Sequence, residues 1–177
     1  MFEFDTSKNY QKTTKSKSLI RFQDCDPMEH LNNAKYFDYY YNAREDQVPK
    51  LYGVELSAIY TAFDAAWVVY NHQIAYIRPA VMGEWVKLFS RIISFDHNSV
   101  IVEYFMTNED ESQLKNILWT TRKYVNVAGN STEHPDKIMD YLNAVKHEAI
   151  ESSELDFQKR IKQVKTEILT DKVSVSS

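Results

Sequence analysis

Four side chains in a short segment near the start of the chain carry functional groups that enzymes use to cleave carbonyl compounds. Asp26 and Glu29 carry carboxylates, His30 carries an imidazole and Asn33 an amide. A carboxylate is normally ionised at neutral pH, so it can activate water as a general base or attack a carbonyl carbon itself. Asp26-Pro27 is also a common turn or cap, and on the residues alone this simpler interpretation is favoured.

Cysteine and histidine, two further residue types that often do chemistry, indicate no additional site. Cys25 is the only cysteine, so the chain has neither an internal disulfide nor a cysteine-based metal cluster. We interpret Cys25 as a small apolar filler rather than a nucleophile. The other histidines show no ligand-like spacing with one another or with carboxylates; they are His72, His97, His134 and His147. We therefore predict no metal and no cofactor.

Composition and net charge limit the classes of protein to which the chain can belong. The 177 residues are one domain's length, and 44% of them are hydrophobic, which predicts a folded globular protein. The formal net charge is −4 and no dense basic stripe is present, which excludes nucleic acid as the main partner. No apolar run has the form of a secretory signal or the length of a membrane span. Together with the single cysteine, this predicts a cytoplasmic protein.

The residues that could do chemistry lie between a predicted strand and a predicted helix. Residues 18–24 are typical of a short first strand. From Asn32 to Val48 the apolar residues recur along one broad face, which predicts a helix that an asparagine caps at its start. Pro49 should end or kink that helix. Asp26 would then lie in a loop just ahead of a helix N-terminus.

Four long β-like runs follow, and apolar residues occur on both faces of these strands. The runs are Ala65–Arg78, Glu84–Phe95, Val100–Thr107 and Leu114–Val127. The second run alternates, which predicts Phe89 and Ile93 on one face and Val86, Leu88 and Ile92 on the other. One helix can cover only one side of such a sheet, so the other side needs a second cover. A partner subunit is one candidate. The last amphipathic segment, Phe157–Ile168, is another, in cis or in trans.

The order of one strand, one long helix and four strands predicts an α+β layer arrangement. Shorter helices are predicted at Ser57–Tyr60 and Thr132–His147. We divide the chain into a polar N-terminal leader (1–17), a helix-and-sheet domain (18–130) and a C-terminal helical extension with a ragged end (131–177). The pattern supports this fold class and no particular activity.

The segment from Arg21 to Tyr36 resembles the signature of the 4-hydroxybenzoyl-CoA thioesterase-like hotdog family. In that signature a strand ends in Asp-x-Asp, here Asp24 to Asp26, and after a loop His30-Leu31-Asn32-Asn33 opens the central helix. Tyr76–Ala80 is similar to the end of the family's second strand, and the resemblance covers residues 18 to 130. It implies a hotdog fold, with a five-stranded antiparallel sheet wrapped around a long central helix, and the hydrolysis of an acyl-CoA thioester.

The resemblance implies a role for each residue of the loop. Asp26 would be the general base or the nucleophile, with His30 and Asn33 beside it. Negative charge grows on the thioester oxygen during attack, and the N-terminus of the central helix offers unpaired N–H donors for it. Losing one good donor of this kind typically costs about 3–4 kcal/mol of transition-state stabilisation. His30 could instead hydrogen-bond its own loop, and both interpretations stay open.

Four further residues are candidates for contacts with the substrate. Glu29 stands where most relatives have glycine, and it is either a surface loop residue or a second acid. Asn32 is a helix cap or a substrate contact. Arg78 and Arg122 are candidates for binding the CoA phosphates.

The resemblance leaves two alternatives to an acyl-CoA hydrolase. The loop is also similar to that of plant acyl-ACP thioesterases, so an acyl carrier protein is an alternative thiol carrier. The second alternative is not an enzyme: a hotdog domain that binds an acyl ligand or serves in assembly. The presence of Asp26, His30 and the asparagine pair together argues against it. Relatives pair two sheets edge to edge, so the resemblance also implies a homodimer or homotetramer with Asp26 near the neighbouring chain.

Overall fold

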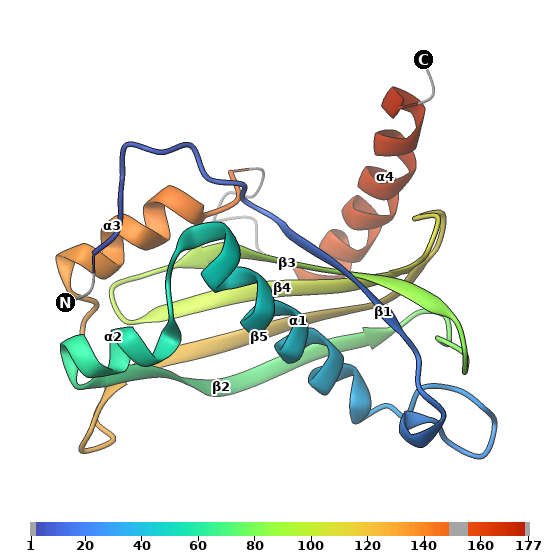
Figure 1. Ribbon diagram of the computed structural model, residues 1–177, viewed down its shortest axis with the longest axis horizontal. Coiled ribbons are helices and arrows are strands. Elements are labelled where there is room, and N and C mark those ends of the chain that lie inside the picture. The colour runs from blue at the N-terminus through green and yellow to red at the C-terminus, as the bar shows by residue number, and fades with distance from the viewer. Residues whose placement is uncertain (1–2, 149–155, 176–177) are drawn as a thin grey trace.

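The computed structural model describes residues 3–148 and 156–175. Five strands form one antiparallel sheet in the order β1-β3-β4-β5-β2. The strands are β1 (Thr14–Leu19), β2 (Ala65–Tyr76), β3 (Trp85–Phe95), β4 (Ser99–Asn108) and β5 (Leu114–Asn126). The long helix α1 (Lys35–Tyr52) lies across the sheet (Figure 1). We call the face that packs on α1 the inner face and the opposite one the outer face. This is the α+β arrangement predicted from the sequence.

The alternation of β3 places its side chains as predicted. Val86, Leu88 and Ile92 belong to the main core together with residues of α1. Phe89 and Ile93 lie on the outer face, in two smaller apolar clusters. Because successive side chains of a strand point to opposite faces, one sequence run supplies both layers.

The first strand is not where the sequence predicted it. It spans Thr14–Leu19 rather than 18–24, and Phe22–Asp24 is a short 3-10 helix. The strand is polar because β1 is an edge strand that pairs with β3 alone, and edge strands tolerate charged side chains. Local apolar content around Leu19 was therefore a poor guide to its position.

The central helix also departs from the predicted limits. It begins at Lys35, continues past Pro49 and ends before Gly53, whose φ is +67°. Proline lacks one N–H, but here it lies in the last turn, where the Pro49 carbonyl still accepts the N–H of Gly53 at 2.9 Å. Glycine adopts this left-handed conformation without a steric cost, so the helix ends at Gly53.

Three further helices complete the fold: α2 (Leu56–Phe63), α3 (Asp136–Val145) and α4 (Phe157–Val175). The segment predicted to cover the second face does so within the same chain, since Val164 and Ile168 of α4 pack with Phe89, Phe105 and Ile117 on the outer face. This decides the open question about the last amphipathic segment in favour of a cis contact. None of the helices in residues 3–148 and 156–175 is long and apolar enough to cross a membrane.

A buried cluster of four charges also fixes α4 to the sheet. Glu103 of β4, fully buried, accepts hydrogen bonds from Arg91 Nε at 2.7 Å and from Arg160 Nε at 2.9 Å. Glu167 of α4 pairs with both arginines, at 2.8 Å from Arg91 and 2.6 Å from Arg160. We call Arg91, Glu103, Arg160 and Glu167 the outer charge cluster. The two arginines and two glutamates balance in charge.

Candidate active site

The carboxylate of Asp26 is held by its own loop. Its Oδ1 accepts the backbone N–H of Met28 at 2.8 Å and of His30 at 3.1 Å, and the N–H of Asp26 donates to the carbonyl of His30 at 2.8 Å. These bonds close a tight turn over Asp26–His30. Both bonds to the carboxylate come from backbone N–H groups. Within the described residues, the backbone of the loop therefore holds the carboxyl group in place, and no other side chain does.

The loop is docked onto the connection between β2 and β3. The N–H of Leu31 donates to the carbonyl of Ala80 at 2.8 Å, and the N–H of Met82 donates to the carbonyl of Glu29 at 2.9 Å. On the other side, Asp24 Oδ2 accepts the hydroxyl of Tyr39 in α1 at 2.9 Å. The segment that carries Asp26 is therefore tied to both the sheet and the central helix.

Glu29 occupies a left-handed backbone conformation, with φ at +60°. Residues other than glycine pay a steric cost there, which agrees with the glycine that the family resemblance implies at this position. The side chain is exposed and makes no hydrogen bond or ion pair within the described residues. Glu29 therefore adopts a backbone conformation that glycine favours, with its side chain in solvent.

The two asparagines lie just ahead of α1 and serve different purposes. Asn32 Oδ1 accepts the N–H of Ala34 at 3.0 Å, and the Asn32 carbonyl accepts the N–H of Lys35 at 2.8 Å. The carbonyl of Asn33 accepts the hydroxyl of Tyr76 at 2.9 Å. The backbone N–H of Asn33 has no partner in residues 3–148 and 156–175, so it is one donor at this end of α1 that a ligand oxygen can reach.

His30 and Cys25 flank the carboxylate without competing for it. The His30 imidazole, partly buried, makes no hydrogen bond within the part of the chain that the structure describes. Burial raises the pKa of the Cys25 thiol, and the carboxylates of Asp24, Asp26 and Glu29 raise it further. A thiol that resists deprotonation is a poor nucleophile.

The two candidate arginines are not brought together. Arg78 follows β2, is exposed, and lies two residues before the Ala80 carbonyl that holds the loop. Arg122 is on β5 opposite Val69, where it lines a cavity between α1, α2 and the inner face. The structure therefore places Arg78 beside the Asp26 loop and Arg122 beneath the middle of α1.

The sequence predicted only packing for the tyrosines at the start of α1, and it did not predict that tyrosines support the loop. Tyr39 bonds Asp24, Tyr76 bonds Asn33, and the hydroxyl of Tyr36 accepts the N–H of Ala80 at 3.3 Å. Tyr36 and Tyr39 are three residues apart and therefore share a face of α1. That spacing, directly after the Asn-Asn pair, was the available signal.

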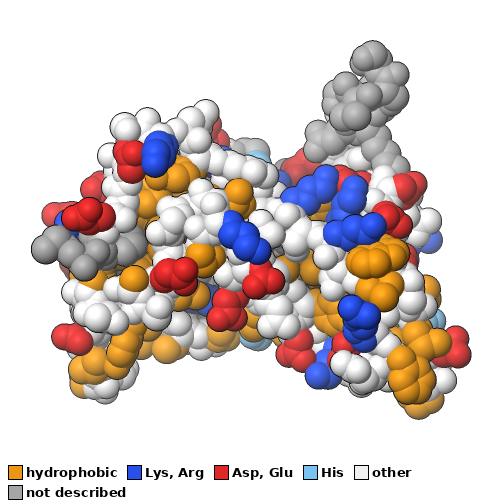
Figure 2. All heavy atoms as spheres, in the orientation of Figure 1, with side chains coloured by type: hydrophobic (Ala, Val, Ile, Leu, Met, Phe, Trp, Pro, Cys, Tyr) orange, Lys and Arg blue, Asp and Glu red, His pale blue; other side chains and the backbone are white. Residues whose placement is uncertain are grey.

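Exposed apolar side chains surround the loop at this end of the molecule. They are Phe22 (80% exposed), Met28 (72%), Val81 (41%), Met82 (37%) and Trp85 (43%). Figure 2 shows hydrophobic and basic side chains mixed at the right-hand end of the face, over β1 and the segment before α1. A surface of this composition suits an amphiphilic ligand better than a purely polar one.

Two comparisons with known proteins agree on the family to which the chain belongs. Residues 20–142 match the family described as the thioesterase-like superfamily. The long-chain acyl-CoA thioesterase FadM of Escherichia coli (strain K12) is 33% identical over 98 residues, which cover 54% of this chain and 70% of FadM.

Solved structures agree on the fold. The YbaW probable thioesterase from Escherichia coli superposes with a TM-score of 0.66 at 24% identity, covering 75% of this chain and 99% of that one. The 12:0-ACP thioesterase from Umbellularia californica gives 0.69 at 14% identity, covering 81% and 55%. A 1,4-dihydroxy-2-naphthoyl-CoA thioesterase from Synechocystis gives 0.65 at 15% identity, covering 75% and 95%. These likenesses confirm the predicted hotdog fold.

Proposed function

The chain belongs to the thioesterase-like superfamily and is a thioester hydrolase; from this premise we propose that it hydrolyses acyl-CoA to a free acid and CoA, with Asp26 as the general base. One observation carries the proposal. The Asp26 carboxylate is fixed through Oδ1 by two backbone N–H groups, which leaves its other oxygen to take a proton from water beside the start of α1.

The proposed reaction has two steps. Water attacks the thioester carbon while Asp26 takes its proton, and negative charge moves to the carbonyl oxygen. The unpaired N–H of Asn33, next to the positive end of α1, stabilises that charge. The carbon–sulfur bond then breaks, and the thiolate of CoA leaves and takes up a proton. His30 lies beside the carboxylate to position the acyl group or the water.

A covalent route through Asp26 is the second candidate for the mechanism. In that route the carboxylate attacks the thioester and an anhydride forms, which water then opens. A single turnover in ¹⁸O-labelled water separates the routes. With a general base the label enters only the released acid, whereas attack of water on the aspartyl carbonyl of an anhydride places it in Asp26.

The choice of CoA as thiol carrier follows the relative of higher sequence identity. FadM, named a long-chain acyl-CoA thioesterase, is 33% identical, whereas the acyl-ACP thioesterase structure is 14% identical. Exposed Arg78 beside the loop supplies positive charge for the CoA phosphates. We place the enzyme in the cytoplasm, where a free thiol such as Cys25 is stable.

A screen of short, long and aromatic acyl-CoAs tests the proposed function. Release of free thiol is followed for each substrate, with the same acyl groups on an acyl carrier protein as the second arm. We expect at least one acyl-CoA to be hydrolysed with kcat/KM of about 10⁴ M⁻¹s⁻¹ or more. If only acyl-ACP is hydrolysed, the thiol carrier is acyl carrier protein and not CoA. If neither is hydrolysed, the result favours the non-catalytic domain.

We further propose a homodimer that pairs through β2. This strand is at one edge of the sheet, and Val68, Val69 and Tyr70 are 45%, 47% and 69% exposed along it. An edge with unpaired backbone groups and apolar side chains readily pairs with a second copy. Light scattering at micromolar concentration should give the mass of a dimer or tetramer, and an active monomer would contradict the proposal.

A further inference from the structure

The inner face of β5 carries a row of polar groups whose hydrogen bonds are incomplete. Asn116, Thr120, Arg122 and Tyr124 alternate along the strand. Three buried atoms among them have no hydrogen-bond partner: Nδ2 of Asn116, Nε of Arg122 and the hydroxyl of Tyr124. Buried polar atoms are nearly always paired, so each unpaired one requires an explanation. Of these three residues, Arg122 is the one that lines the cavity described below, where a ligand could bring an oxygen atom to its guanidinium.

Arg122 is the charged member of this row. Its guanidinium lies 5.2 Å from the ring centre of Tyr41, and its Nη2 donates a long bond of 3.4 Å to the hydroxyl of Tyr104. No ion pair within the described residues includes Arg122, although the side chain is only partly exposed. A cation withdrawn from water without an acid beside it favours the approach of an anion.

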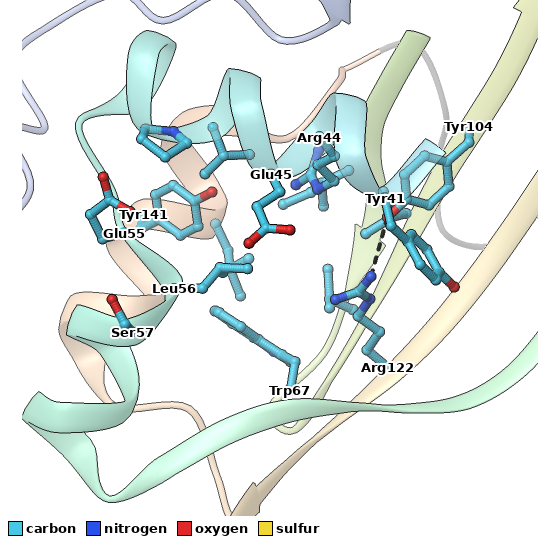
Figure 3. Close-up of a pocket in the computed structure, with 16 residues that line it drawn as sticks. Tyr41, Arg44, Glu45, Glu55, Leu56, Ser57, Trp67, Tyr104, Arg122 and Tyr141 are labelled. Carbon is cyan, nitrogen blue, oxygen red and sulfur yellow. Dashed lines mark hydrogen bonds between the residues drawn. The ribbon is translucent and has the colours of Figure 1, made fainter. Parts of the chain in front are cut away.

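The guanidinium of Arg122 forms part of the wall of a cavity of about 360 Å³. Figure 3 shows Arg122 with Tyr41 and Tyr104 on one side of this space, and Leu56 and Trp67 below it. Most of the remaining wall is apolar: Val48, Ile92, Val100, Val102 and Leu142. A pocket of this size, apolar but for a few placed polar groups, is typical of sites for small amphiphilic ligands.

Other charged groups reach the same cavity. Arg44 lines it and donates to the hydroxyl of Ser90 at 2.9 Å. Glu45 and Glu55 also line it, but their side chains are exposed, so water and salt screen their repulsion of an anion. The partly buried Arg122 is screened less and dominates the electrostatics at its end of the cavity.

Two groups of aromatic side chains lie between this cavity and the Asp26 loop. Tyr76, which bonds Asn33, contacts Tyr36 with ring centres 5.4 Å apart. Further along α1, Phe37 lies 4.9 Å and Tyr41 6.5 Å from the ring of His72. Tyr41 is the residue under the guanidinium. Tyr36 and Phe37 are consecutive residues of α1, so we treat the two groups as one aromatic line beside α1 between the proposed oxyanion donor and Arg122.

The length of this line can be estimated from strand register. Tyr76 pairs with Asn116 and Val69 with Arg122, so the two ends are separated by roughly 20 Å at about 3.3 Å per residue of strand. An extended covalent chain advances roughly 1.2 Å per bond, a third of the length of one extended residue. A chain of about sixteen bonds would thus reach from Asn33 to Arg122.

We propose that this cavity takes the far end of a long acyl chain, and that Arg122 makes the enzyme select acyl groups that end in a carboxylate. The proposal rests on the proposed acyl-CoA hydrolysis and names its substrate class. The chain would lie along the aromatic line, and its terminal carboxylate would pair with the guanidinium of Arg122. An acyl chain that ends in a methyl group would leave that guanidinium without an anionic partner.

The test compares two substrates of equal length, hexadecanoyl-CoA and the mono-CoA thioester of hexadecanedioic acid. We expect wild-type kcat/KM to be at least about tenfold higher for the carboxylate-ended substrate, as for a charge-assisted hydrogen bond. Arg122→Met, which keeps an unbranched side chain and removes the guanidinium and its charge, should bring the ratio close to one. Lys123→Met is the matched control, because Lys123 is the next residue of β5 and bonds Asn98 Oδ1 at 3.0 Å instead; it should leave the ratio unchanged.

The outcomes separate this inference from the proposed function. Hydrolysis of both substrates with a wild-type ratio near or below one overturns the inference and leaves the thioesterase intact. A ratio that favours the carboxylate but survives Arg122→Met also overturns it, because another group would then recognise the carboxylate. If wild type hydrolyses no acyl-CoA at all, the proposed function and this inference fall together.

Discussion

The Asp26 loop and the outer charge cluster hold carboxylates in opposite ways. Asp26 is partly exposed, and in the described structure its carboxylate bonds only to backbone N–H groups of its own loop. Glu103 is fully buried, and its two oxygens bond the side chains of Arg91, Arg160 and Trp119. The first carboxylate is fixed in place but open to a ligand, whereas the second has no room for one.

The difference indicates which carboxylate serves chemistry and which serves the fold. Buried charges are stable only when they are paired and hydrogen-bonded, and the arginines keep the pKa of Glu103 low although burial alone would raise it. A catalytic carboxylate instead needs a free oxygen and a route for substrate. Substitutions in the two regions should therefore affect different measurements.

Asp26→Ala should have the largest effect. It removes the charge together with the two bonds from the backbone of Met28 and His30. We expect kcat to fall about a hundredfold to ten-thousandfold, while the lost hydrogen bonds cost about 1–2 kcal/mol of stability. Steady-state thiol release and urea unfolding measure the two effects. Substantial turnover in this variant would move the chemistry away from the loop.

Glu103→Gln should affect the fold instead. Removing this charge leaves Arg91 and Arg160 buried with only Glu167 to balance them, and breaking a buried pair typically costs about 3–5 kcal/mol. Urea unfolding measures the loss, and the folded fraction should keep wild-type kcat. Glu109→Gln is the matched control, because Glu109 pairs with Lys17 at the surface and is 55% exposed; its cost should stay below about 1 kcal/mol.

A contradictory result for the cluster would be equally clear. If Glu103→Gln were as stable as Glu109→Gln, the ion pairs would contribute little, and α4 would be held by its apolar contacts alone. If the folded variant lost turnover, the outer face would be coupled to the site, and the division between the two regions would fail.

His134 should make a smaller contribution to the free energy of unfolding, and that contribution should depend on pH. The Nε1–H of Trp67 donates to His134 Nε2 at 2.9 Å, which requires a neutral imidazole, and burial lowers the pKa of His134. A group whose pKa is lower when folded binds fewer protons in the folded state. The stability from His134 is therefore complete above the unfolded value of about 6.5 and is lost as pH falls below it.

Comparing unfolding at pH 7.5 and pH 5.5 tests this assignment. Wild type should be less stable at pH 5.5, and His134→Gln, which keeps an acceptor for Trp67, should reduce that difference. His147 also has a pKa lowered by burial, so some difference should remain. His97→Gln, at an exposed position, should change it only slightly, because His97 is the smallest of the influences on the pKa of His134. A difference as large in His134→Gln as in wild type would assign the pH dependence elsewhere.

Glu29→Gly should have the smallest effect and the opposite sign. The left-handed conformation at φ +60° costs a residue with a side chain roughly 1–2 kcal/mol. Glycine avoids this cost, but its greater backbone entropy in the unfolded state offsets part of the gain. We expect a net gain of about 0.5–1 kcal/mol, with kcat/KM within a few-fold of wild type. Glu29→Gln should also stay active, and a large loss of kcat in both variants would make Glu29 a second acid.

The sequence was most informative where structure depends on neighbours along the chain. The alternation of Glu84–Phe95 predicted which side chains of β3 face each layer, because strand geometry fixes that pattern locally. The family motif likewise located the loop around Asp26 and the glycine-like position of Glu29. Only the structure shows how strongly that loop is tied to Ala80 and Met82.

The features that were missed depend on residues far apart in the sequence. The position of β1 is set by its pairing with β3, from Thr14 opposite Ser90 to Leu19 opposite Trp85, and a polar edge strand has no local apolar signal. Arg122 resembles any other cation on a strand until the sheet places its guanidinium over the ring of Tyr41. No spacing in the sequence brings Arg160 to Glu103, which lies 57 residues earlier.

The most direct test of the central claim is the Asp26→Asn variant. Asparagine keeps an oxygen that can accept the N–H groups of Met28 and His30, so the turn should persist and the melting temperature should stay within a few degrees of wild type. Only the negative charge is lost. Thiol release from the best acyl-CoA should then fall by at least about a hundredfold. Turnover near wild type in this folded variant would contradict the assignment of Asp26 as the catalytic base.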